Sequence, residues 1–146
     1  MDFGNKFEVF YDLFIVGEGW KRVLSVGLVN TLLIAIIGLL IGMVLGTLIA
    51  AVKVMPKYKR LPRALDKICS FYVGFFRGTP LVVQLLIAYY VLWPLFNISI
   101  SSLNTSIIVF GLNSAAYISE IMRGGIQSVD PGQTEGGRAV GLSYSA

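Results

Sequence analysis

The sequence of 146 residues contains no histidine and a single cysteine, Cys69. One cysteine cannot form a disulfide framework within the chain, and without histidine it cannot supply the ligand cluster of a metal site. Charged residues are also scarce, at 14%, where a soluble domain carries about a quarter. The scarcity of charge therefore indicates a non-aqueous environment. No residue is assigned a catalytic or metal-binding role.

Hydrophobic residues are abundant instead, at 55% of the sequence. Two stretches, residues 23–52 and 78–119, contain no charged residue. About 20 apolar residues cross a hydrocarbon core of roughly 30 Å, so the first stretch fits one crossing and the second fits two. The second divides at the polar residues 97–105, just after Trp93, because tryptophan favours the membrane boundary. We expect an all-α, multi-pass membrane protein with spans at about 23–52, 72–96 and 103–127.

Basic residues indicate the orientation of these spans. Residues 97–105 carry no charge, whereas the loop after the first span carries Lys53, Lys57, Lys59, Arg60, Arg63 and Lys67. The positive-inside rule places the basic loop in the cytoplasm and the amino terminus outside, although Lys21 and Arg22 then lie at the outer edge. Topology explains the basic cluster, so the net charge of +4 does not indicate a nucleic-acid partner.

The first two spans contain features of helix packing and of a helix break. Gly38, Gly42 and Gly46 share one helical face, which lets another span or subunit approach closely. In the second span, the run from Arg77 to Pro80 predicts a break, since proline lacks a backbone donor. Arg77 either snorkels to the cytoplasmic interface or lines an internal cavity. Gln84 is expected to face protein rather than lipid.

The third span carries a polar face formed by Asn113, Ser114, Tyr117 and Glu120. A carboxylate inside a span is costly and faces a partner or a water-filled path. Glu120 can pair with Arg123 one turn on, pair across helices with Arg77, or contribute to a substrate path. The candidate path residues are therefore Arg77, Gln84, Asn113, Ser114, Tyr117 and Glu120.

The segment that follows, residues 130–143, predicts a short cytoplasmic helix. Asp130 is a suitable N-cap and Pro131 a suitable first helical residue, while Gly141 can end the helix in a left-handed conformation. Gly136 and Gly137 weaken the helix by about 1 kcal/mol each relative to alanine. It is not a phosphate-binding loop, because GxxxxGK[ST] is missing. A weak, partly apolar cytoplasmic helix suggests a docking partner.

Two segments, "FFRGTPLVVQLL" and "NSAAYISEIMRGGIQSVDPGQTEGGRAVGLS", resemble the permease subunits of bacterial ABC importers for polar amino acids. The family's cytoplasmic EAA motif reads Glu-Ala-Ala, three residues, then Gly. In this sequence the motif becomes Glu135, Gly136, Gly137, Arg138, Ala139, Val140 and Gly141. The spacing fits, but two glycines replace the alanines, which predicts a less rigid helix.

The resemblance implies a permease subunit of an ATP-driven amino-acid uptake system in the bacterial inner membrane. It implies a homo- or heterodimer of permease subunits, an external substrate-binding protein, and a cytoplasmic ATPase that binds ATP and Mg. The chain would not itself be an enzyme. Its ATPase-coupling residues would be Glu135, Gly136, Gly137, Arg138, Ala139 and Gly141. Family members continue with two more spans, so residues 1–146 are expected to be a partial transmembrane domain with three spans of five.

Two other classes of function stay open on the residues alone. A self-sufficient channel or secondary carrier would suit a polar span, and a carrier is typically built from inverted repeats; this sequence shows none. A small structural membrane protein would use the glycine face but leave the polar third span unexplained. The amino acid carried is not determined, although a path-facing Glu120 would favour a cationic one.

Overall fold

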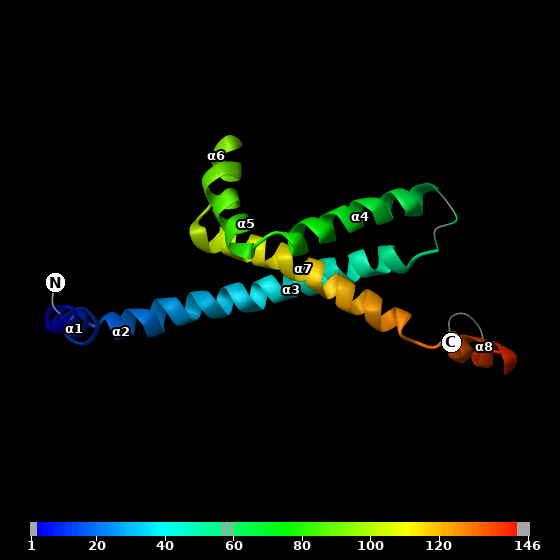
Figure 1. The fold of residues 1–146 in the computed structure, drawn as a ribbon, viewed down its shortest axis with the longest axis horizontal. Coiled ribbons are helices and arrows are strands. Elements are labelled where there is room, and N and C mark those ends of the chain that lie inside the picture. Colours follow the sequence, from blue (N-terminus) through cyan, green and yellow to red (C-terminus); the bar gives the residue numbers. More distant parts are fainter. Residues whose placement is uncertain (1–2, 57, 59, 143–146) are drawn as a thin grey trace.

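The computed structural model describes residues 3–56, 58 and 60–142, and all regular elements in these ranges are helices (Figure 1). The α-helices are α1 (Phe3–Tyr11), α2 (Gly19–Arg22), α3 (Leu28–Val54), α4 (Arg60–Gly78), α5 (Leu81–Ile87), α6 (Trp93–Leu95), α7 (Ser102–Gln127) and α8 (Pro131–Ala139). Three short π-helical segments join some of them: η1 (Asp12–Val16), η2 (Val23–Gly27) and η3 (Ala88–Leu92). The expected all-α class is confirmed.

Within the part of the chain that the structure describes, two helical stretches are long and apolar enough to cross a membrane: Gly19–Val54 and Ser102–Gln127. They contain the first and third expected spans. The second expected span, 72–96, falls on a bent pair in which α4 and Leu81–Leu95 meet at 104°. This pair counts as a third span if both arms belong to one crossing.

Helix α4 begins at Arg60, well before the expected start of the second span. Its first turns include Arg63 and Lys67, which were expected in a cytoplasmic loop. Charge is costly inside a bilayer, but arginine and lysine are good helix formers. The basic segment is therefore largely helix, and its charges mark the end of the span rather than a break in secondary structure.

Close packing of α3 on α7 forms the centre of the structure (Figure 1). Gly38, Gly42 and Gly46 are buried, and the predicted close approach occurs within the chain, against α7. A Cβ atom built on Gly42 would lie 2.6 Å from Ser114 Cβ, and one on Gly46 would lie 2.9 Å from Ile118 Cβ. Such contacts let van der Waals attraction hold helices where lipid provides no hydrophobic drive between them.

The order of the glycine contacts fixes the relative direction of the two helices. Gly42 meets Ser114, and Gly46, one turn later, meets Ile118, one turn later on α7. Both helices therefore run in the same direction. The segment between α3 and α7 contains α4, α5 and α6. It must return the chain to the end of the helix pair at which α3 begins. At that return point the Trp93 indole N–H donates to Thr105 Oγ1 on α7 (3.0 Å).

Candidate translocation and coupling sites

The break between α4 and α5 lies at Pro80, where a backbone hydrogen bond is missing. Proline has no N–H, so the Phe76 carbonyl four residues earlier loses its helical donor. Gln84 Nε2 donates to this oxygen at 3.0 Å, and Asn113 Nδ2 donates to it at 3.2 Å. Side chains from α5 and α7 thus replace the missing donor, as a polar backbone group inside a membrane protein requires.

The same two amides are bonded to each other and to the rest of the break. Asn113 Nδ2 donates to Gln84 Oε1 (3.2 Å), and Gln84 Nε2 also donates to the Thr79 carbonyl (3.0 Å) and hydroxyl (2.7 Å). Gln84 is only 8% exposed, so the prediction that it faces protein is confirmed. The contact between Gln84 and Asn113 was not predicted from the sequence; the signal available was a proline with two amides in the flanking spans.

An apolar cavity of ≈ 180 Å³ lies beside this break, between the bent pair and α7. Its lining is aromatic and aliphatic, with Phe75, Leu92 and Val109 among its residues, and Thr79 and Gln84 are its polar members. Both are already engaged in the hydrogen bonds of the break. The cavity suits an apolar group far better than a charged or zwitterionic solute, because burying polar groups without partners is costly.

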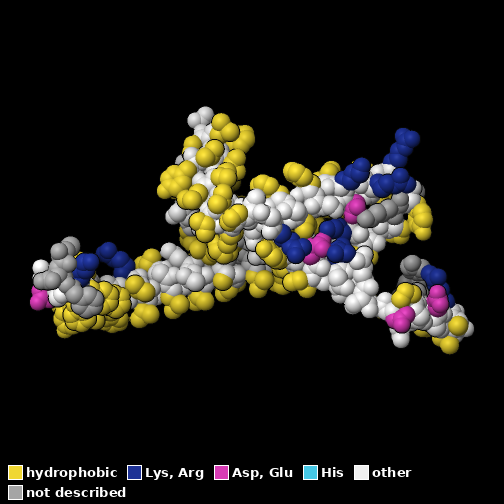
Figure 2. Space-filling model, in the orientation of Figure 1, with side chains coloured by type: hydrophobic (Ala, Val, Ile, Leu, Met, Phe, Trp, Pro, Cys, Tyr) yellow, Lys and Arg dark blue, Asp and Glu magenta, His cyan; other side chains and the backbone are white. Residues whose placement is uncertain are grey.

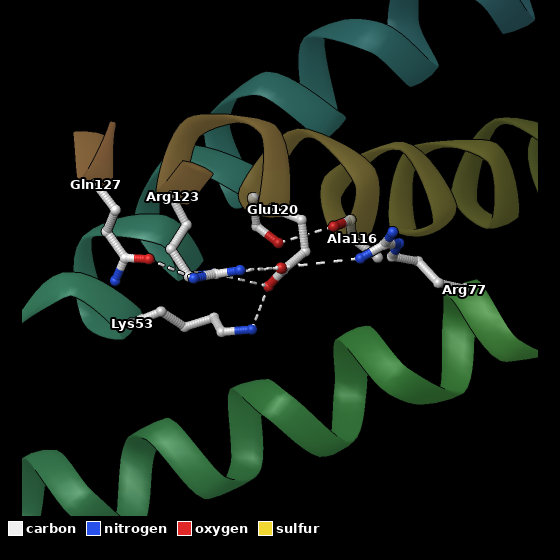
Figure 3. A network of polar contacts seen from close by, with 7 residues as sticks. Lys53, Arg77, Ala116, Glu120, Arg123 and Gln127 are labelled. Atoms are coloured by element: carbon white, nitrogen blue, oxygen red, sulfur yellow. Dashed lines mark hydrogen bonds and ion pairs between the residues drawn. The ribbon is translucent and has the colours of Figure 1, made fainter. Parts of the chain in front are cut away.

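Glu120 lies at the centre of a cluster of three cations (Figure 3). Arg123 Nη2 donates to Glu120 Oε2 at 2.8 Å, and Arg77 Nη1 lies 3.8 Å from the same oxygen. Glu120 therefore pairs with both Arg123 and Arg77, the two partners that were considered from the sequence. Lys53 donates to Glu120 Oε1 as well, a contact that sequence reasoning missed by assigning Lys53 to the loop. One carboxylate thus joins α3, α4 and α7.

The six candidate path residues differ in what they contact. Ser114 packs on Gly42 at the α3–α7 interface, and the Glu120 side chain is 17% exposed among its cations. Arg77 lies over the Tyr117 ring, with its Cζ atom 5.4 Å from the centroid, in a cation–π contact. The Arg77 side chain is 44% exposed and Tyr117 is 46% exposed. Arg77 and Tyr117 are therefore the exposed members of the six candidate path residues.

The predicted coupling segment forms α8, and its ends follow the expected capping. Asp130 Oδ1 accepts the Gly132 N–H (2.8 Å), and Pro131 occupies the first turn. Gly141 has φ +85°; its N–H donates to the Arg138 carbonyl and the Leu142 N–H donates to the Gly137 carbonyl, both at 3.0 Å. These two bonds form a Schellman motif, which requires a left-handed residue where glycine stands.

Helix α8 extends beyond the end of α7, apart from the other helices (Figure 1). Ala139 is exposed, and Val140 and Leu142 after the helix are 77% and 56% exposed. Glu135 and Arg138 are exposed on the same short element. The last residue of the predicted segment, Ser143, lies outside the described residues. A capped helix with polar and apolar side chains is thus presented at one end of the molecule.

The chain can now be compared with known proteins. The family described as binding-protein-dependent transport system inner membrane component matches residues 38–146. The chain belongs to this family. The match begins at the first glycine of the α3 interface and includes the broken helix, the Glu120 cluster and α8. Membership places the chain in a membrane, and the helices long enough to span one agree with this.

Relatives in this inner-membrane component family are amino-acid permeases by name. The chain is 40% identical to the arginine transport system permease protein ArtQ of Bacillus subtilis (strain 168), over 81% of its length and 52% of that protein. It is 39% identical to the L-cystine transport system permease protein TcyB of the same organism, over 89% and 53%. The chain spans about half the length of these curated relatives.

A solved structure also resembles this member of the family. It is described as the crystal structure of an amino acid ABC transporter with histidines, and it matches with a TM-score of 0.75 and 32% sequence identity. The match covers 90% of this chain and 59% of that one. The fold is therefore that of an amino-acid ABC transporter permease.

Proposed function

We propose that this chain contributes to the translocation unit of an ATP-driven amino-acid uptake system in the bacterial inner membrane. The observation that carries the proposal is α8, a capped helix that projects from the end of α7. The names of the relatives support amino acids as the transported class. An external binding protein would deliver the amino acid, and a second permease subunit, identical or related, would complete the path.

The coupling surface is the exposed side of α8 and the turn after it. Its residues are Glu135, Gly136, Gly137, Arg138, Ala139 and Gly141. We place this surface in the cytoplasm and the amino terminus outside, because the basic residues that follow α3 favour the cytoplasmic side. Since α3 and α7 run in the same direction, α8 emerges on that side too. A cytoplasmic ATPase that binds ATP and Mg would dock here.

The polar face of α7 would have two roles. Arg77 and Tyr117, which are nearly half exposed, face the path, where a cation over an aromatic ring can meet a polar solute. Gln84, Asn113, Ser114 and Glu120 hold the helices that position this pair, as their contacts with α3 and with the α4–α5 break suggest. In this arrangement, substitutions at Arg77 and Tyr117 change uptake with little loss of folded protein.

Co-purification with the ATP-binding subunit tests the coupling proposal. The chain is co-expressed with that subunit as wild type, as Glu135→Ala and as Gly141→Val. Glu135→Ala removes the carboxylate proposed to contact the subunit, and Gly141→Val puts a β-branched residue at φ +85°, which unwinds the end of α8. Loss of central docking contacts lowers affinity by about tenfold or more, so both variants should lose most of the subunit.

Glu8→Ala is the matched control, because it removes an exposed carboxylate from α1 at the other end of the molecule. It should retain the ATP-binding subunit fully. Equal retention by all variants would contradict docking through α8. Amino-acid uptake into vesicles that lack ATP and any ATP-binding subunit would instead favour a secondary carrier.

A further inference from the structure

The first half of α4 carries a stripe of positive charge. Arg60, Arg63 and Lys67 are spaced by three and four residues, so they lie along one side of the helix. All three are exposed. Figure 2 shows basic side chains gathered at the α4 end of the molecule that is far from α5. The positive-inside rule depends on the number of basic residues in a loop and does not require them to lie on one side of a helix.

A second exposed stripe, made of large apolar side chains, runs beside the basic one. Leu61, Ile68 and Phe71 are 70%, 65% and 77% exposed, and Leu65 and Phe75 are exposed as well. Val73, on the opposite side of α4, is 4% exposed. At the edge of the apolar stripe, the Tyr72 hydroxyl donates to the Leu112 carbonyl (2.6 Å). Neither outward stripe is therefore the packing face.

We propose that these two stripes form a binding site for an anionic phospholipid of the cytoplasmic leaflet. The basic stripe would hold the phosphate headgroup, for which arginine offers two parallel N–H donors. The apolar stripe would contact the acyl chains. A helix with a basic side, an apolar side and low net hydrophobicity is typical of a membrane interface rich in anionic lipid.

The position of α4 in the chain fits this occupant better than a soluble partner. Its basic residues lie at the end joined to α3 by the loop from Met55, and its apolar stripe continues toward the break at Pro80. The two stripes overlap between Arg60 and Lys67, and the apolar one continues to Phe75, so the acyl chains would extend along α4 beyond the headgroup. A soluble acidic protein would meet the charges but would leave Phe71 and Phe75 uncovered. The proposal does not depend on transport or on the ATPase.

Lipid binding to the purified full chain in neutral detergent tests the site. The probe is fluorescent phosphatidylglycerol, with phosphatidylcholine of the same acyl chains as the neutral probe. The variant Arg60→Gln/Lys67→Gln removes two charges of the stripe. Since each basic residue near a lipid surface contributes about a fivefold change in affinity, the variant should bind phosphatidylglycerol roughly 25-fold more weakly. Its binding of phosphatidylcholine should not change.

The matched control is Lys21→Gln/Arg22→Gln, which removes the same charge from α2 at the far end of the α2–α3 stretch. It should change phosphatidylglycerol affinity by less than about twofold. Phe71→Ser should weaken both probes alike, because it removes acyl-chain contact and leaves the charge. Thermal unfolding of each variant checks that it is folded.

Two outcomes would overturn the proposal. The first is equal loss of phosphatidylglycerol binding in the two double variants, which would show a non-specific charge effect. The second is unchanged phosphatidylglycerol binding in Arg60→Gln/Lys67→Gln. If that variant also loses the co-purified ATP-binding subunit, the stripe is a protein contact instead. A failure of ATPase docking through α8 would leave the lipid measurements unaffected.

Discussion

The α3–α7 interface and the α4–α5 break hold helices together in opposite ways. At the interface, the glycines of α3 let α7 approach so closely that Ser114 and Ile118 fill the space a glycine side chain would occupy. At the break, a backbone bond is missing and the amides of Gln84 and Asn113 replace it. Lipid supplies no hydrophobic drive between helices, so stability must come from close packing or from satisfied polar groups. This chain uses one solution for a straight pair and the other for a bent one.

The largest expected effect comes from filling the glycine interface with Gly42→Leu. The new Cβ would lie 2.6 Å from Ser114 Cβ and 3.3 Å from the Ala115 nitrogen. Neither atom can rotate away, so α3 and α7 must separate. We expect a loss of about 3 kcal/mol or more, above the usual range for overpacking. Fluorescence-detected unfolding in detergent measures it, and a wild-type midpoint would show that the interface is not close-packed.

The next largest effect is expected at Glu120, the carboxylate that links the α3–α7 pair to α4. Glu120→Gln removes the partner of Lys53, whose side chain is only 11% exposed. Removing one partner of a fully buried pair costs about 3–5 kcal/mol; partial exposure reduces this to about 2 kcal/mol. The same unfolding assay measures the loss.

Lys53→Gln in the Glu120→Gln background should recover part of the stability, because it removes the unpaired cation. The matched control Lys67→Gln, on exposed α4 surface, should recover none. Equal recovery by both would mean that Lys53 and Glu120 do not interact.

A smaller loss is expected at the break. Gln84→Leu leaves the Phe76 carbonyl with Asn113 alone and removes the donor to the Thr79 carbonyl. Leaving a buried acceptor unsatisfied costs about 1–3 kcal/mol. Because the Asn113 amide still donates to the Phe76 carbonyl, the expected loss of stability lies near the lower limit. Adding Pro80→Ala restores a backbone donor and should return part of the stability. If Pro80→Ala destabilises the variant further, the two amides do not substitute for the missing N–H.

The smallest effect is expected from Gly38→Ala, on the same face as Gly42. The added Cβ would lie 3.4 Å from Phe110 Cβ, which is ordinary contact. Alanine is also about 1 kcal/mol better than glycine in a helix. The midpoint of unfolding should change little, and any change should be an increase in stability. A large loss would show that the interface is as tight at Gly38 as at Gly42.

Local patterns predicted the features that depend on neighbouring residues. The first and third spans, the shared glycine face and the capping of α8 by Asp130 and Gly141 all follow from spacing within a few turns. Features that depend on residues far apart were not predictable in the same way. Lys53 meets Glu120 across 67 positions, and Gln84 meets Asn113 across 29. The break at Pro80 was expected, but its 104° bend and the amide contacts across it were not.

The three-residue connection between α7 and α8 has a mechanical consequence. Residues 128–130 link the helices, and Ser128 is bonded back to the last turn of α7 through its N–H and its hydroxyl. A displacement of α8 would therefore be transmitted directly to α7, and through the glycine contacts to α3. The nearest bend at which the helices could move relative to this pair is the 104° break beside Pro80.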